Sequence, residues 1–251
     1  MTTLPIGLQL YSVRDDCARD LPGVLKAVAG MGYVGVEFAG YYGYTAPELR
    51  AVLDENGLQC CGTHTALDTI LGDELPRTIE FNRMLGNKFL IVPSLPEERR
   101  VSRAAWLDTA RLFDEASERA AAEGMWVGYH NHSEEFQLLD GELPWDLFFG
   151  HTRPEVVMQV DTGNMRHGGA EPAPFLSRYP GRALTVHLKE YSATDPNALI
   201  GDGDINWAEI FALCESVGGT KWYIVEQESG IYPPMECVDR CLQNLRGIGK
   251  G

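Results

Sequence analysis

The sequence contains no long apolar run and comparatively few basic residues. No apolar stretch approaches the roughly 18 residues that a membrane-spanning helix requires, and residues 1–16 lack a basic segment followed by an apolar one. We therefore expect no signal peptide, no membrane partner and a cytoplasmic location. The 36 acidic residues outnumber the 21 basic ones, which gives a formal net charge of −15. A field of that sign repels nucleic-acid backbones, so nucleic acid is not an expected partner.

The sequence also lacks paired-cysteine motifs. Six cysteines are present, and none forms a CxxC pair: Cys17, Cys60, Cys61, Cys214, Cys237 and Cys241. We expect them to act as small core hydrophobes in a reducing compartment, without disulfide bonds.

No flexible linker or break in composition divides the chain. At 251 residues, with 44% hydrophobic and 23% charged residues, the composition is that of an ordinary globular protein, which excludes disordered and fibrous classes. Single barrels of alternating strands and helices reach about this length. We therefore predict one domain over residues 1–251.

Short apolar runs rich in β-branched residues recur along the whole chain. Each run is nearly continuous in apolar character, which is typical of parallel strands buried on both faces. The predicted strands are 6–13, 33–38, 58–64, 88–93, 125–130, 156–161, 183–188 and 222–227.

Amphipathic stretches of helical period separate these runs. Leu21, Leu25 and Val28 fall on one face of a predicted helix, and residues 104–123 repeat the pattern over several turns. Two capping-box spacings mark helix starts, and these are Thr45 with Glu48 and Asn206 with Glu209. Eight alternating units predict a parallel eight-stranded (β/α)8 TIM barrel, with a doubly wound open sheet as the alternative.

Polar or ionisable side chains stand at the ends of most predicted strands. In a barrel, the carboxyl ends of all strands lie on one face, where active sites are built. The residues concerned are Glu37, His64, His130, Asn131, His132, Asp161, His187, Lys189 and Glu226. Such convergence is hard to explain by packing alone.

Three of these residues on successive strands have the chemistry of a metal site. Two carboxylates, Asp161 and Glu226, and the imidazole of His187 suit Mn²⁺, Mg²⁺, Co²⁺ or Zn²⁺. Each residue alone also fits a structural role, because a strand-end histidine is usually only hydrogen-bonded and Asp161 before Thr-Gly can cap a turn. Lys189 could bind an oxyanion or a phosphate group of the substrate, or it could be an ordinary exposed lysine.

Two further features are weaker. Tyr41, Tyr42 and Tyr44 follow the second strand and fit either a wall for sugar stacking or a loop packed on the barrel rim. The segment 201–204, Gly-Asp-Gly-Asp, lacks the spacing of a phosphate-binding loop and predicts a tight turn before the helix that Asn206 opens.

An ordered set of segments gives the chain a resemblance to a known superfamily over essentially its full length. The segments are GLQLYSVR, GYVGVEF, GYHNHSEEF, QVDTGN, TVHLKE followed by GDGDINW, and VEQE. They resemble the xylose-isomerase-like barrels, in particular the sugar phosphate isomerase/epimerase group. The resemblance implies one divalent metal ion held by strands five to eight.

Carried over residue by residue, the resemblance implies Asp161, His187 and Glu226 as metal ligands. The strand-five ligand of the family is usually a glutamate, and here the aligned residue is His130, although His132 shares its parity and remains an alternative. The resemblance also implies Glu226 as a catalytic base. The second acid–base group is then one of His130, His132, Glu134 and Glu135, unless the reaction needs one base alone. Candidate substrate-binding residues are Glu37, His64, Asn164 and Lys189.

The leading functional hypothesis is a metal-dependent isomerase or epimerase of a small-molecule sugar or sugar phosphate. It would abstract a proton next to a carbonyl and pass through a metal-stabilised enediolate. The alternative is a lyase or dehydratase of keto-sugars, keto-inositols or 3-keto-glycosides, in which His130 or His132 protonates the leaving oxygen. A non-catalytic sugar-binding barrel is a third hypothesis. Nuclease activity, known from endonuclease IV in the superfamily, ranks last because of the acidic charge. A homo-oligomer is compatible with the sequence.

Overall fold

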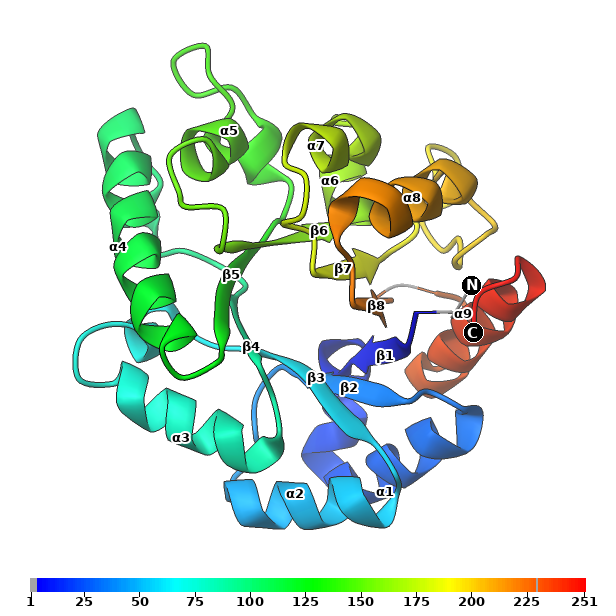
Figure 1. The fold of residues 1–251 in the computed structure, drawn as a ribbon. Helices are drawn as coiled ribbons and strands as arrows, with labels where there is room; N and C mark the ends of the chain where they lie inside the picture. Colours follow the sequence, from blue (N-terminus) through cyan, green and yellow to red (C-terminus); the bar gives the residue numbers. More distant parts are fainter. Residues whose placement is uncertain (1–3, 229) are drawn as a thin grey trace.

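The chain folds into a closed barrel of eight parallel strands that follow one another in sequence order (Figure 1). The computed structural model describes residues 4–228 and 230–251. The strands are β1 Ile6–Gln9, β2 Gly35–Phe38, β3 Gln59–His64, β4 Phe89–Val92, β5 Trp126–His130, β6 Val157–Asp161, β7 Thr185–Leu188 and β8 Trp222–Val225. Pairing of β1 with β8 closes the barrel, with Leu8 opposite Val225. The predicted TIM barrel is confirmed, and each strand lies within its predicted run.

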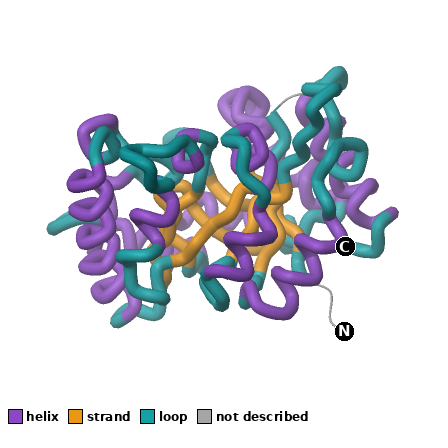
Figure 2. Tube along the Cα trace, turned by 90° about the horizontal axis from the view of Figure 1, so that it is seen from above, coloured by secondary structure: helices purple, strands orange, loops and turns teal. Residues whose placement is uncertain are grey.

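Helices surround the barrel, so that the strands lie at the centre of the molecule (Figure 2). The α-helices are α1 Arg14–Met31, α2 Ala46–Glu55, α3 Leu75–Leu85, α4 Arg103–Ala121, α5 Pro144–Phe149, α6 Thr162–His167, α7 Pro172–Arg178, α8 Trp207–Leu213 and α9 Pro234–Gly247. Short 3-10 turns cover Leu10–Val13, Leu67–Ile70, Glu97–Arg99 and Glu134–Phe136, and a π-turn covers Cys214–Gly218. No helix in the described ranges has both the length and the apolar character of a membrane span.

The first predicted strand was too long. The strand ends at Gln9, and Leu10–Val13 form a 3-10 turn that leads directly into α1. The Gln9 side chain accepts a hydrogen bond from the Tyr11 backbone N–H at 3.0 Å, which turns the chain away from the strand direction. Leu10 and Val13 are nevertheless buried, so the apolar pattern continued past the strand end for reasons of packing.

The predicted helix signals are present. Glu48 accepts a hydrogen bond from the Thr45 backbone N–H at 2.8 Å, and the side chain of Asn206 accepts one from the Glu209 backbone N–H. The helix faces predicted for α1 and α4 are buried against the barrel. Helices α2 and α8 therefore begin where a polar side chain satisfies a backbone donor that the helix itself leaves unpaired.

The tyrosines after β2 belong to the rim of the barrel. Tyr41 packs on Phe38 and Phe81, with ring centroids 6.0 and 4.3 Å away, and Tyr42 and Tyr44 also pack against the hydrophobic core. Rim packing therefore accounts for this cluster. All six cysteines are buried and free, as small core residues would be.

Close packing between β5 and its neighbours generates a stability prediction. A Cβ atom added at Gly128 would lie 2.7 Å from both the Val157 carbonyl oxygen and the Ile91 side chain. We expect Gly128→Ala to lower the free energy of unfolding by about 1–3 kcal/mol, as overpacking does. Gly30→Ala is the matched control, because nothing lies within 4 Å of the added atom. In helix α1 it should raise stability by about 0.5–1 kcal/mol. Urea unfolding measures the free energy of unfolding of both variants. Equal effects of Gly128→Ala and Gly30→Ala would contradict the close packing of β5 against its neighbours.

Candidate metal centre and active site

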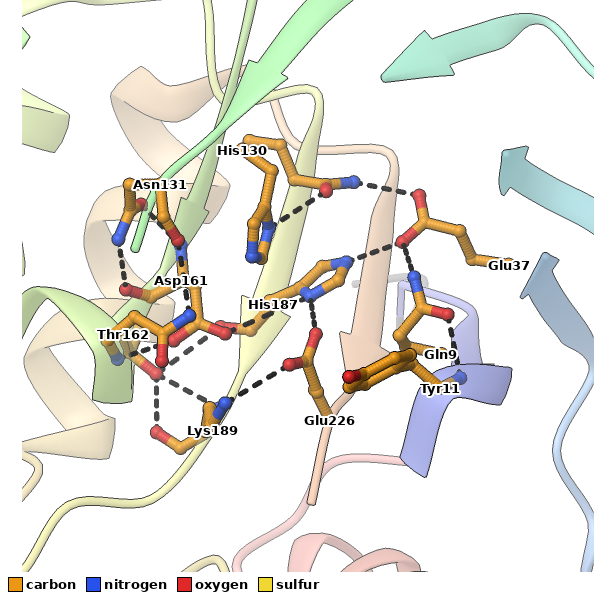
Figure 3. A network of polar contacts seen from close by, with 12 residues as sticks. Gln9, Tyr11, Glu37, His130, Asn131, Asp161, Thr162, His187, Lys189 and Glu226 are labelled. Atoms are coloured by element: carbon orange, nitrogen blue, oxygen red, sulfur yellow. Dashed lines mark hydrogen bonds and ion pairs between the residues drawn. The ribbon is translucent and has the colours of Figure 1, made fainter. Parts of the chain in front are cut away.

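The strand-end residues predicted from the sequence converge at one end of the barrel (Figure 3). His187 lies at the centre of this group and is fully buried. Its Nδ1 lies 2.7 Å from a carboxylate oxygen of Glu226, and its Nε2 lies 2.6 Å from one of Glu37. Burial by itself lowers the pKa of His187, but the two carboxylates raise it to about 10. The imidazole is therefore protonated in this arrangement.

Glu37 supports the site from within the barrel. Its carboxylate accepts hydrogen bonds from Gln9 at 2.7 Å and from Gln159 at 2.9 Å, in addition to the contact with His187. Burial alone would raise the pKa of Glu37, but contacts with His64 and His187 hold it well below its usual range. Glu37 was predicted to bind substrate, yet it is fully buried and does not border the cavities described below.

Gln159 lies on β6, makes hydrogen bonds to residues of β2, β3, β5 and β7, and was missed by the sequence analysis. Because the carboxylate of Glu37 only accepts hydrogen bonds, the amide NH₂ of Gln159 faces it and the amide oxygen faces the imidazoles. That oxygen accepts from His64 Nε2 at 2.9 Å and from His130 Nδ1 at 3.1 Å. A signal was present in the sequence, since Gln159 lies two residues before Asp161 and shares its side of the strand.

His130 has the properties of a metal ligand. Burial and the neighbouring His187 hold the pKa of His130 well below its usual range, so the imidazole is neutral. Its Nδ1–H donates to Gln159, which leaves Nε2 as the nitrogen with a free lone pair. This arrangement, in which a supporting group binds one ring nitrogen and orients the other, is typical of metal-binding histidines.

Asp161 contains a buried oxygen that lacks a partner. Its Oδ1 accepts a hydrogen bond from the Asn164 backbone N–H at 2.6 Å and caps α6, whereas Oδ2 has no hydrogen-bond partner among the described residues. Burial raises the pKa of Asp161 to about 7, although Lys189 and His187 act in the opposite direction. An unpaired buried carboxylate oxygen is costly, and a bound cation removes that cost.

Four of the converging side chains form a group with the spacing of a metal site. Each of His130, Asp161, His187 and Glu226 offers one ligand atom, and these atoms lie within 4.8 Å of one another. We call this group the quartet. Mixed imidazole and carboxylate donors suit Zn²⁺, Mn²⁺ or Co²⁺. Metal binding requires His187 to lose a ring proton. His132, the alternative strand-five ligand, lies outside the quartet.

Lys189 is part of the site rather than an exposed surface lysine. Its Nζ donates to Glu226 at 3.1 Å and also pairs with Glu228. Burial lowers the pKa of Lys189, but the carboxylates of Asp161, Glu226 and Glu228 outweigh this effect and raise it. Its charge is therefore already balanced by neighbouring carboxylates.

Two cavities lie near the quartet, and quartet residues border only the first of them. The first, which we call the reaction cavity, has a volume of about 490 Å³, and its lining includes Tyr11, His64, His130, His132, Glu226 and Glu228. The second cavity has a volume of about 310 Å³ and is bordered by Asn164 and Lys189, among others. His132 and Glu228 border both cavities.

His132 lies at this boundary and is held there by Glu135. The His132 backbone N–H donates to Glu135 at 2.9 Å, and the Tyr129 hydroxyl donates to the other oxygen of the same carboxylate at 2.5 Å. Glu135 was predicted to be catalytic, but it is 1% exposed and borders neither cavity. The 3-10 turn Glu134–Phe136 directs it back toward the protein interior, so we assign it a positioning role.

The fold and this arrangement of residues match a known family. The family model described as the xylose isomerase-like TIM barrel matches residues 25–246. The chain belongs to the xylose isomerase-like TIM barrel family. The resemblance seen in the sequence segments is thus confirmed.

Relatives of this xylose isomerase-like barrel have different names. An inosose dehydratase of Geobacillus kaustophilus is 26% identical, and the match covers 92% of this chain and 93% of the relative. A solved structure of a sugar phosphate isomerase/epimerase from Parabacteroides distasonis is 25% identical, with a TM-score of 0.84 over 99% of this chain and 96% of that one. The structure of the IolI protein with a bound zinc atom has a TM-score of 0.76 and 13% identity, covers 98% of each chain, and shows the shared fold. These relatives support an enzyme.

The orphan oxygen of Asp161 generates a prediction about metal content. We expect Asp161→Asn to lower the affinity for Mn²⁺ or Zn²⁺ by more than the roughly 10–100-fold that loss of a supporting residue causes. The amide keeps an oxygen to cap α6, so the fold should persist. Elemental analysis after dialysis measures bound metal. Asp108→Asn, which alters an exposed carboxylate on α4, is the control and should retain full metal content. Equal metal content in the two variants would remove Asp161 from the ligand set.

Proposed function

We propose that this barrel is a divalent-metal-dependent lyase that removes water from a small polyhydroxylated ketone. The observation that carries the proposal is the end of β5, which presents the imidazoles of His130 and His132 where the family resemblance implies a carboxylate base. His130 is engaged in the quartet, whereas the imidazole of His132 lies outside it and borders the reaction cavity together with Glu226.

The quartet fits a cation because Asp161 Oδ2 is buried without a donor and His130 carries a free lone pair. When bound, a divalent cation supplies Lewis acidity, which polarises the carbonyl of the substrate and acidifies the neighbouring C–H. Glu37, Gln159 and Gln9 orient the surrounding side chains through the hydrogen bonds described above. They act without touching the substrate.

Glu226 is placed to remove the proton. It is buried, and its two oxygens are held by His187 at 2.7 Å and by Lys189 at 3.1 Å. Burial alone would raise the pKa of Glu226, but Lys189 and His187 hold it well below its usual range, so the carboxylate is ionised at neutral pH. Glu226 can therefore accept the proton on the carbon next to the carbonyl, as general-base catalysis requires.

His132 is placed to assist the leaving group. As the C–H bond breaks, its electron pair forms a carbon–carbon double bond, and the C–O bond on the next carbon breaks. His132 donates a proton to the departing oxygen, which leaves as water. Glu226 then returns its proton to solvent, and His132 takes one up. The products are an unsaturated ketone and water, and the reaction is redox-neutral.

The relative named inosose dehydratase supports this proposal, because its name describes loss of water and the match covers nearly the whole of both chains. Isomerisation or epimerisation is the second candidate, which the Parabacteroides distasonis structure favours by its name. In that reaction, His132, which borders the same cavity as Glu226, would return a proton to carbon. The two candidates differ in whether a C–O bond breaks.

Incubation of the manganese-loaded protein with an inosose and a panel of ketoses in deuterated water tests the proposal. Proton NMR should show a new vinyl signal, and ultraviolet absorbance should show a conjugated ketone. Deuterium on the carbon next to the carbonyl, together with an epimer or aldose and no unsaturated product, would replace the proposal with the second candidate.

The roles of Glu226 and His132 can be separated. Glu226→Gln should abolish both loss of water and exchange of the substrate C–H with solvent deuterium. His132→Ala should lower the rate of water loss by about 10²–10⁴-fold, the usual contribution of one acid–base group, while C–H exchange continues. His151→Ala replaces an exposed histidine just after α5 that borders neither cavity, and it should have no effect on either rate. Loss of exchange in His132→Ala would assign proton abstraction to His132 instead.

A further inference from the structure

The second cavity is not needed for dehydration of a single sugar-sized ring. None of the quartet residues borders it, and it shares the lining residues His132 and Glu228 with the reaction cavity. Its wall is formed largely by α6 and by the segment 189–198 after β7. A substrate that fills both cavities would therefore pass His132.

A buried carboxylate fixes the loop that forms this wall. Glu190 is 6% exposed and accepts hydrogen bonds from the backbone N–H of Gly201 at 2.7 Å, from that of Ile205 at 3.2 Å and from Trp207 Nε1 at 2.8 Å. It also accepts one from the Tyr191 backbone N–H at 3.0 Å. Charged hydrogen bonds of this kind compensate for the burial of the carboxylate. The cavity wall is thus preorganised by the fold.

The second cavity offers the groups that recognise a hydroxylated ring. Amide, hydroxyl and carboxylate groups of Asn164, Ser192 and Asp195 border it together with the ring of Tyr191. The imidazole of His167 packs edge-on against Tyr191, with ring centroids 5.0 Å apart. The Arg166 guanidinium lies over one face of the Tyr191 ring, with its carbon 4.9 Å from the centroid. The rest of this ring and the hydrogen-bonding groups around it suit the mixed polar and C–H surface of a sugar.

The charges around both cavities favour a neutral ligand. Lys189 is the one lysine or arginine among the described residues that border them, and it is paired with Glu226 and Glu228. Asp195 adds further negative charge. Phosphate groups are normally bound by arginine forks, lysines or backbone N–H groups at helix N-termini. A phosphorylated substrate would instead meet carboxylates here.

We propose that the second cavity is a subsite for a neutral, hydroxyl-bearing substituent attached to the leaving oxygen. The site then takes, beside a free ring ketone that loses water, an O-substituted ring ketone such as a keto-glycoside, and it disfavours a phosphorylated keto-sugar. This inference rests on the proposed lyase function and specifies its substrate class. The C–H bond next to the carbonyl breaks, its electron pair forms the double bond, the C–O bond to the substituent breaks, and His132 protonates the departing alcohol. The products are an unsaturated ketone and an alcohol.

A variant that fills the second cavity tests the proposal. Ala198 borders this cavity and is 8% exposed, whereas Ala193 lies exposed on the same loop and borders neither cavity. For a keto-disaccharide, Ala198→Leu should lower kcat/KM by about tenfold or more, and it should leave the value for an inosose within about twofold. Ala193→Leu should match the wild type with both substrates. Equal losses with both substrates, or no loss with either, would overturn the subsite.

Binding measurements separate failure of the subsite from failure of the proposed reaction. Calorimetry with manganese-loaded protein compares a non-reacting disaccharide, a monosaccharide polyol and a sugar phosphate. Tighter binding of the disaccharide, lost in Ala198→Leu and kept in Ala193→Leu, supports the subsite even if no ketone is turned over. Tyr191→Ala removes the aromatic ring from the cavity wall without overpacking and should also weaken disaccharide binding. It replaces Ala198→Leu in the test if that variant does not fold. Equal affinity for disaccharide and monosaccharide, or tighter binding of the phosphate, would overturn the proposal.

Discussion

Three carboxylates, those of Glu37, Asp161 and Glu226, lie buried at the carboxyl end of the barrel, and their charge has to be balanced inside the protein. His187 bridges Glu37 and Glu226, and Lys189 contacts Glu226 from the other side. Lys189 also pairs with Glu228, so the two cationic groups face more carboxylates than they can balance. That excess coincides with the oxygen of Asp161 that has no donor. A divalent cation at the quartet satisfies both conditions, and the rest of the site is arranged around it.

The barrel explains why these groups meet. Their positions along the chain are far apart, but parallel strands of a closed barrel bring every carboxyl end to the same face. The loops that follow the strands then define what reaches the quartet. The turn after β5 places His132 at the junction of the two cavities, and the loop after β7, fixed by Glu190, forms the wall of the second cavity. In the proposed function, the quartet supplies the chemistry and these loops select the substrate, so that different parts of the chain set the two.

Strand positions and the ionisable strand ends could be predicted because both leave strong local patterns. Buried parallel strands have continuous apolar runs, and Asp161, His187 and Glu226 interrupt those runs at their ends. Gln159 was missed because its only signal was the spacing of two residues from Asp161, and its role depends on a contact with β2 that only the closed barrel creates. The inward direction of Glu135 could not be predicted either, since it depends on the geometry of a single 3-10 turn.

Anomalous X-ray diffraction from manganese-loaded crystals tests the central claim most directly, namely that the quartet is a metal centre. The account predicts a strong anomalous peak at ligand distance, about 2.0–2.3 Å, from Asp161 Oδ2, with His130, His187 and Glu226 completing the site. It also predicts that His187 no longer bridges two carboxylates. Absence of a peak at the quartet, with Asp161 Oδ2 instead hydrogen-bonded to an ordered water and His187 still bridging Glu37 and Glu226, would contradict the account.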